Sequence, residues 1–137
     1  MQTFLPYASF KKSAQVLDYR RLGKQRVEGM QILNILLNVT NKQGWKNHPA
    51  VLMWKGYENA LKLYVNICIH EWVVRGYNNN MGLYKVEKPV IYPPWFKCVK
   101  FHSAHRSNLL RKDLTYYNQF KWIEPIDLPY YWPNKKP

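Results

Sequence analysis

The chain has 137 residues, and its 47% hydrophobic and 21% charged residues are typical of one folded domain, which we expect to span residues 1–137. The 21 Lys and Arg residues outweigh 8 Asp and Glu residues, and the resulting formal net charge of +13 indicates a polyanionic partner and favours nucleic acid. No apolar run is long enough to span a membrane and no signal-peptide pattern opens the chain, so we expect a protein of the cytoplasm, nucleoid or viral-host compartment that is not secreted.

The first predicted helix spans residues 13–38. Ser13 is its expected N-cap, and apolar residues recur along one face at approximately helical spacing. Gly23 lowers the stability of a helix interior, so its presence suggests that another backbone approaches closely there. Residues 40–47 are predicted to form a turn region.

The second predicted helix begins near Pro49 and ends at Gly76. A proline suits the first turn because no N–H donor is needed there, and glycine after Arg75 is a common stop signal. Residues 77–88 are predicted to be a polar loop. Residues 89–94 contain three prolines, which exclude a regular helix.

The third predicted helix spans residues 104–114. From Tyr116 onward the chain is aromatic, and we expect this tail to wrap over the helices and not to form a sheet. Prolines recur along it at Pro125, Pro129, Pro133 and Pro137. The predicted fold class is therefore mostly α: a compact single domain of about three helices with long irregular connections and an aromatic, Pro-rich C-terminal tail.

A basic segment at residues 18–28 contains the first group of candidate functional residues. Its cations, which we expect to bind phosphate, are Arg20, Arg21, Lys24 and Arg26. Steps of three and four residues place a second set on one helical face: Asp18, Arg21, Gln25 and Glu28. A carboxylate within a phosphate-binding surface is unfavourable unless it has a function, so Glu28 is the first catalytic candidate and Asp18 the second. The alternative for Glu28 is an ion pair with Lys24.

A second basic segment, at residues 102–113, combines cations with short polar side chains of the kind that contact phosphate. The expected nucleic-acid ligands there are His102, His105, Arg106, Ser107, Asn108, Arg111 and Lys112. The histidine pair could also bind a metal ion, but no third ligand lies at a diagnostic spacing, so we expect no metal.

His48 precedes the second predicted helix and either lines a site or caps that helix. Cys68 and Cys98 are too few for a disulfide scaffold and lack the paired spacing of a zinc site, so they are expected to be free thiols. The sequence has no glycine-rich phosphate-binding loop, nucleophile elbow or zinc-deaminase signature, and we expect no cofactor.

Several motifs spread over nearly the whole chain resemble those of the pyrimidine dimer DNA glycosylase (endonuclease V-type) family, most closely its bacterial and viral-type members. The motifs start at Met1 (MQTFLP), Arg21 (RLGKQRVE), Gly44 (GWKNHP), Met53 (MWKGY), His105 (HRSNLLRK) and Leu128 (LPYYWP). The resemblance implies a compact helical domain whose N-terminus threads between helices.

The same resemblance implies an enzyme that flips a nucleotide out of a damaged duplex and cleaves its glycosidic bond. The N-terminal amine, here that of Met1, would attack the sugar with help from a glutamate on a helix, and the imine would then permit strand cleavage. An α-amine suits this role because part of it is neutral and nucleophilic near neutral pH.

Two positions depart from the pattern of the phage members. Gln2 is larger than the small second residue that permits removal of the initiator methionine. Arg21 occupies the place, directly after Tyr19-Arg20, where the phage members have their glutamate. Glu28 and Asp18 are the remaining carboxylates in reach of that place on the helix.

The main hypothesis is a DNA glycosylase, with AP lyase activity as its second step, that acts on damaged or modified pyrimidines in double-stranded DNA. The alternatives are a non-catalytic DNA-binding module of the same fold and an RNA-binding protein, because basic charge and aromatic residues do not separate DNA from RNA. We expect a monomer without an obligate protein partner.

Overall fold

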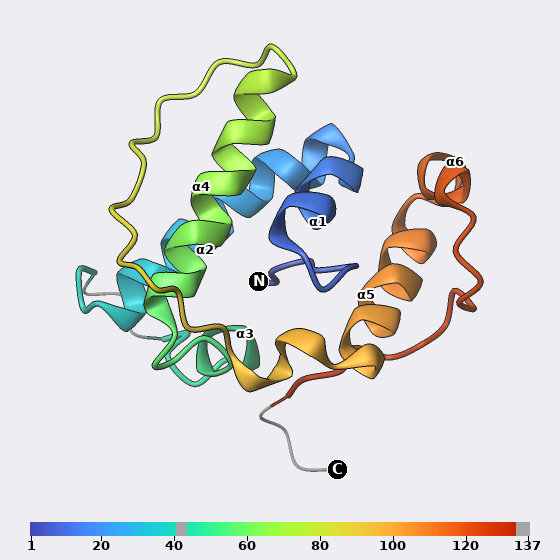
Figure 1. Ribbon diagram of the computed structural model, residues 1–137. Coiled ribbons are helices and arrows are strands. Elements are labelled where there is room, and N and C mark those ends of the chain that lie inside the picture. The colour runs from blue at the N-terminus through green and yellow to red at the C-terminus, as the bar shows by residue number, and fades with distance from the viewer. Residues whose placement is uncertain (41–43, 134–137) are drawn as a thin grey trace.

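The computed structural model describes residues 1–40 and 44–133, and within these ranges it contains helices and no strands (Figure 1). The elements are α1 (Phe10–Val16), α2 (Tyr19–Leu36), α3 (Pro49–Leu52), α4 (Glu58–Val74), the 3-10 turn η1 (Pro94–Lys97), α5 (Val99–Lys112), α6 (Leu114–Tyr117) and the 3-10 turn η2 (Asn118–Phe120). None of the described helices is long and apolar enough to cross a membrane. The predicted fold class, mostly α with long irregular connections, is confirmed.

The first predicted helix is in fact two helices, α1 and α2, and the prediction of one continuous helix was wrong. The backbone is extended at Leu17 and Asp18, and the Asp18 side chain accepts a hydrogen bond from the Arg21 backbone nitrogen as the N-cap of α2. Ser9, not Ser13, caps α1. The buried Ser13 hydroxyl instead donates to the Tyr7 carbonyl oxygen at 3.1 Å.

The second predicted helix is likewise divided, into α3 and α4. Gly56 has a positive φ of 87° in the turn between them, a conformation that glycine adopts without strain. Pro49 occupies the first turn of α3, as predicted. The predicted stop is also confirmed, because Gly76, with a φ of 91°, follows the C-cap of α4.

Helices α2 and α4 cross in close contact and form the centre of the core (Figure 1). A Cβ added at Gly29 would lie 2.4 Å from Cγ2 of Val65, so only glycine permits this spacing. At Gly23 the close neighbour is the indole ring of Trp72, 3.0 Å from where a Cβ would be, and not another backbone as expected.

The third predicted helix is longer than expected and holds the C-terminal tail. It begins at Val99, and α6 and η2 follow where irregular chain was predicted. Side chains of α5 then bind backbone carbonyl groups of the tail: Asn108 donates to Leu128 at 3.3 Å, and Arg111 donates to Ile126 at 2.9 Å. The tail therefore packs on a helix as predicted; residues 134–137, which include Pro137, lie outside the described residues.

The N-terminal segment, residues 1–6, runs irregularly through the middle of the molecule (Figure 1). Its residues from Gln2 to Pro6 are buried, and Met1 is partly exposed. This path, which the resemblance implied, brings the start of the chain against α2 and α5.

Candidate functional site

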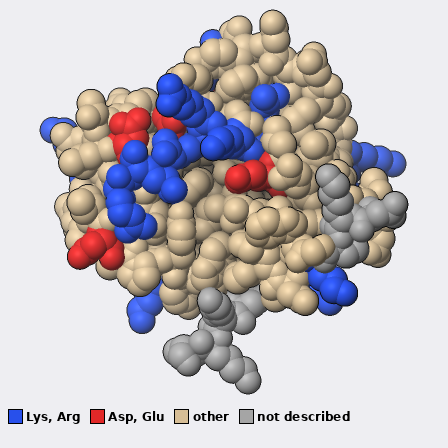
Figure 2. Space-filling model, turned by 180° about the vertical axis from the view of Figure 1, so that it is seen from behind, with Lys and Arg blue, Asp and Glu red and all other residues tan. Residues whose placement is uncertain are grey.

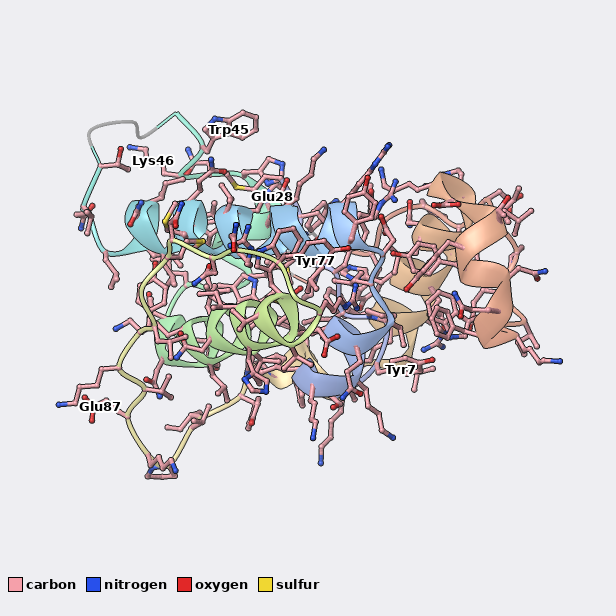
Figure 3. All side chains as sticks on the ribbon, turned by 90° about the horizontal axis from the view of Figure 1, so that it is seen from above. Tyr7, Glu28, Trp45, Lys46, Tyr77 and Glu87 are labelled. Atoms are coloured by element: carbon pink, nitrogen blue, oxygen red, sulfur yellow. The ribbon has the colours of Figure 1, made fainter. Side chains whose placement is uncertain are left out.

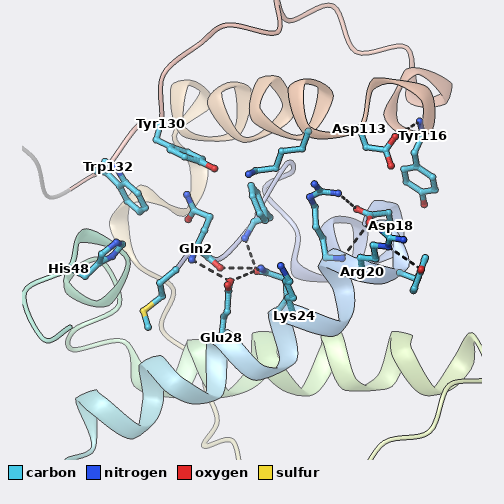
Figure 4. Close-up of a pocket in the computed structure, with 16 residues that line it drawn as sticks. Gln2, Asp18, Arg20, Lys24, Glu28, His48, Asp113, Tyr116, Tyr130 and Trp132 are labelled. Carbon is cyan, nitrogen blue, oxygen red and sulfur yellow. Dashed lines mark hydrogen bonds and ion pairs between the residues drawn. The ribbon is translucent and has the colours of Figure 1, made fainter. Parts of the chain in front are cut away.

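A cleft of about 1180 Å³ lies between the N-terminal segment, α2, the end of α5 and the tail (Figure 4). All four catalytic candidates from the sequence line it: Met1, Asp18, Glu28 and His48. Four of the expected DNA ligands line it as well: Arg20, Arg21, Lys24 and Lys112. Residues from the first half of the chain and from beyond residue 110 therefore meet in one concave surface.

Glu28 projects into the cleft from the middle of α2. Its Oε2 atom accepts from the Gln2 backbone nitrogen at 3.4 Å and from Gln25 Nε2 at 3.3 Å (Figure 4). The buried Gln25 amide also donates to the Gln2 carbonyl oxygen at 3.0 Å, so Gln25 connects the carboxylate to the N-terminal segment. Glu28 takes part in none of the three ion pairs among the described residues, which excludes the Lys24 ion pair in this structure.

Asp18 is buried at the rim of the cleft, and its hydrogen bonds stabilise the local structure. The carboxylate accepts hydrogen bonds from the Tyr117 hydroxyl and from Arg21, with Arg21 Nη1 at 3.2 Å. Burial favours the neutral acid, but the hydrogen bonds from Tyr117 and Arg21 outweigh it and lower the pKa of Asp18. The carboxylate thus caps α2 and fixes the Arg21 guanidinium beside the cleft.

Four cationic side chains line the cleft together with three carboxylates, those of Asp18, Glu28 and Asp113. Burial, together with the positive charges of Arg21, Arg111 and Lys24, lowers the pKa of Lys112, and the Glu28 carboxylate partly opposes this. Lys and Arg side chains form a band across one face of the molecule (Figure 2). Such crowding of like charges is offset when a polyanion binds, because each phosphate pairs with a cation.

Arg26, an expected DNA ligand, does not line the cleft. Its guanidinium lies 4.3 Å from the ring centre of Trp72, and its Nη1 atom donates to Asn79 Oδ1 at 2.7 Å. These contacts join α2 to the end of α4 and to the loop after it. Burial lowers the pKa of Arg26 from its ordinary value.

Most of the second basic segment faces the interior, and this corrects the expectation that it grips phosphate. Four of its polar side chains are buried: His102, His105, Ser107 and Asn108. Arg106 pairs with Glu124 at 2.9 Å and donates to the Pro6 carbonyl oxygen at 2.7 Å. The physical reason is that the N-terminal segment and the tail have no sheet partners, so the polar side chains of α5 supply their hydrogen bonds.

Aromatic side chains, which were not among the candidates from the sequence, form one rim of the site. The His48 ring lies 5.7 Å from Trp132 and 5.4 Å from Trp45, measured between ring centres. Trp45 and Glu28 lie on the same side of α2, away from α4 (Figure 3). His48 is also the N-cap of α3, because its Nδ1 atom accepts from the Ala50 backbone nitrogen at 3.0 Å. Gln25 could have been identified, since it shares a helical face with Glu28.

No group of three or more His, Cys, Asp or Glu side chains within residues 1–40 and 44–133 is arranged to hold a metal ion. The ring nitrogens of His102 and the Nδ1 atom of His105 are instead engaged with backbone groups.

Comparison with known proteins identifies one family. Residues 1–85, more than half of the chain, match the family model described as pyrimidine dimer DNA glycosylase. No curated protein and no solved structure gives a significant match. The matched region includes Met1, α2 and His48, whereas Lys112 and the tail side of the cleft lie beyond it.

Proposed function

The chain belongs to the pyrimidine dimer DNA glycosylase family, and we propose that it removes damaged pyrimidines from duplex DNA by cleaving their glycosidic bonds. The observation that carries this proposal is the Glu28 carboxylate in one cleft with Met1 and with four cationic side chains, those of Arg20, Arg21, Lys24 and Lys112. When a base departs, positive charge develops on the sugar, and a carboxylate stabilises that charge. The surrounding cations bind the flanking phosphates.

The α-amine of Met1 is the proposed nucleophile. Met1 lines the cleft beside Glu28, and the family match begins at residue 1. The amine would form a bond to the sugar C1′ as the glycosidic bond breaks and the base leaves. Loss of a proton from this adduct, with ring opening of the sugar, gives an imine, from which elimination cleaves the strand. This second step is the AP lyase activity.

The damaged nucleotide is proposed to leave the base stack before it reacts. The cleft of about 1180 Å³ is large enough for a nucleotide, and Tyr130 and Trp132 offer ring surfaces for stacking at its tail side. The α2 side of the cleft carries three cations, Arg20, Arg21 and Lys24, which can bind phosphates of the DNA strand that contains the nucleotide.

The test uses two substrates with the intact chain. An ultraviolet-irradiated duplex reports base release, and a duplex with one abasic site, treated with borohydride, reports the imine. The expected results are released bases and a trapped adduct that maps to residue 1 by mass spectrometry.

The other outcomes each select an alternative. Duplex binding without base release or adduct contradicts catalysis and supports a non-catalytic DNA-binding module. Base release without an adduct retains the glycosylase and overturns the amine nucleophile. Preferential binding of single-stranded RNA over duplex DNA overturns the choice of nucleic acid.

A further inference from the structure

The buried N-terminal segment has no β-strand beside it, among the described residues, that could bind its backbone groups. A buried backbone must find hydrogen-bond partners, and here side chains of three helices provide them. On α2, Gln25 Oε1 accepts from the Phe4 backbone nitrogen at 2.8 Å. On α4, the Tyr64 hydroxyl donates to the Phe4 carbonyl oxygen at 2.8 Å. The position of the segment along its own axis therefore depends on individual side chains.

Two histidines of α5 bind the two backbone groups of one residue, Leu5. The Leu5 nitrogen donates to His105 Nδ1 at 2.8 Å, and the Leu5 carbonyl oxygen lies 2.6 Å from His102 Nδ1. His102 and His105 are one helical turn apart and both are buried. The His105 ring must accept from the Leu5 nitrogen, and the His102 ring must donate to the Leu5 carbonyl oxygen. The two histidines can therefore bind the segment in only one backbone direction and with only one residue, Leu5, between them.

The protonation of each ring follows from its partners. His105 accepts at Nδ1, so its proton is on Nε2 and the ring is neutral; burial, with a contribution from the charge of His102, lowers the pKa of His105 to about 3. His102 faces carbonyl oxygens at both nitrogens, those of Leu5 and Phe96, each at 2.6 Å. A carbonyl oxygen only accepts, so His102 Nδ1 is the donor to Leu5.

We infer that His102 and His105 are positioning residues that hold Leu5 in register and thereby place Met1 and the Gln2 nitrogen against Glu28. The inference rests on the proposed function for its catalytic consequence. Only three residues lie between Met1 and Leu5, so a slip at Leu5 moves the start of the chain directly. Misplacement by about 1 Å can lower a rate about a hundredfold.

Two substitutions of His102 distinguish an effect on the register of Leu5 from a general loss of stability. In His102→Asn, the side-chain nitrogen occupies the place of Nδ1 and keeps the donor to Leu5. In His102→Gln, it occupies the place of Nε2 and keeps only the donor to Phe96. Each variant retains one of the two hydrogen bonds, so the two differ in which backbone carbonyl group stays bound.

The first readout is independent of activity. In the parent, ¹⁵N NMR should show a proton on Nδ1 of His102 and on Nε2, not Nδ1, of His105. Amide exchange at Leu5 should accelerate at least about tenfold in His102→Gln and stay close to the parental rate in His102→Asn, because only the former frees the segment. Equal exchange in both variants, or a His102 without a proton on Nδ1, overturns the inference.

The second readout is single-turnover base excision at saturating duplex. His102→Gln is expected to lose at least about tenfold in rate with little change in DNA affinity, and His102→Asn to retain most of the rate. If both lose rate equally, the register role is overturned. If the parent itself releases no base, the proposed function fails, while the exchange comparison still decides whether the histidines hold Leu5.

Discussion

The Glu28 carboxylate accepts a hydrogen bond from the backbone nitrogen of Gln2 at 3.4 Å, although 26 positions separate the two residues in the sequence. The contact joins the middle of α2 to the start of the chain. It places the only glutamate of α2 beside the residue whose amine is the proposed nucleophile. The carboxylate and the start of the chain are therefore held together by a backbone hydrogen bond.

Glu28→Gln is expected to lose at least about a hundredfold in base excision, the scale usual for one catalytic group. The amide keeps the shape and an acceptor oxygen for Gln2, but it has no charge to stabilise a cationic sugar. Duplex affinity should be unchanged or slightly higher, because one repulsion with phosphate is removed. Single-turnover excision and a binding titration measure the two effects separately.

Glu87→Gln is the matched control, since Glu87 is exposed and lies in the loop far from Glu28 (Figure 3). It makes the same chemical change and should excise at the parental rate. Parental excision by Glu28→Gln would instead show that the carboxylate is not catalytic.

Lys24→Ala and Lys112→Ala are each expected to weaken duplex binding irrespective of base sequence, because both lysines line the cleft. The affinity of the parent should fall steeply between about 50 and 200 mM salt, and each substitution should reduce the slope of log affinity against log salt by about one. Fluorescence anisotropy over that salt range measures the slope.

Lys85→Ala removes the same charge from the exposed loop outside the cleft and is the control for net charge. A reduction of the slope by Lys85→Ala as large as that by Lys24→Ala would mean that binding is spread over the surface and not focused at the cleft.

Arg106→Ala is expected to lower the free energy of unfolding by about 2 kcal/mol, because it leaves the partly buried Glu124 carboxylate without its cation. Arg106 forms two hydrogen bonds with this carboxylate and, despite burial that opposes ionisation, lowers its pKa. Urea unfolding measures the change. Lys100→Ala, which removes an exposed charge from the same helix, should have little effect. Unchanged stability with lost duplex affinity would restore Arg106 as a phosphate ligand.

Acid should destabilise the parent through His105. Its pKa falls from the ordinary 6.5 to about 3 on folding, so between these values the unfolded chain binds the proton and the folded chain does not. The contribution to stability is therefore complete above pH 6.5 and is lost as the pH falls toward 3, with a slope of up to about 1.4 kcal/mol per pH unit.

His105→Asn keeps an acceptor for the Leu5 nitrogen but does not titrate, so this variant should lack that part of the slope. Urea unfolding of both proteins at several values of pH gives the difference, in which the carboxylates common to both cancel. Parallel stability curves for parent and variant would contradict a neutral His105 in the folded protein.

Local sequence signals located the three main helical regions but not the breaks within the first two, and they missed α6 and η2. The predictions from Pro49 and Gly76 succeeded because each acts through its own backbone. Asp18 looked like part of a helical face, yet its side chain caps α2 and the tail residue Tyr117 binds it from 99 positions away. Spacing alone does not show whether a polar residue in a helical pattern ends the helix or continues it.

The sequence by itself determined the net charge, the helical class and the group of charged side chains on one face of α2, because these depend on composition and on spacing within a helix. Only the tertiary structure decided which basic residues line the cleft. Lys112 and Arg106 lie six positions apart on α5, but one reaches the cleft while the other pairs with Glu124. The reason is that the backbone groups of irregular buried segments need hydrogen-bond partners, and in the folded protein polar side chains of α5 are those partners.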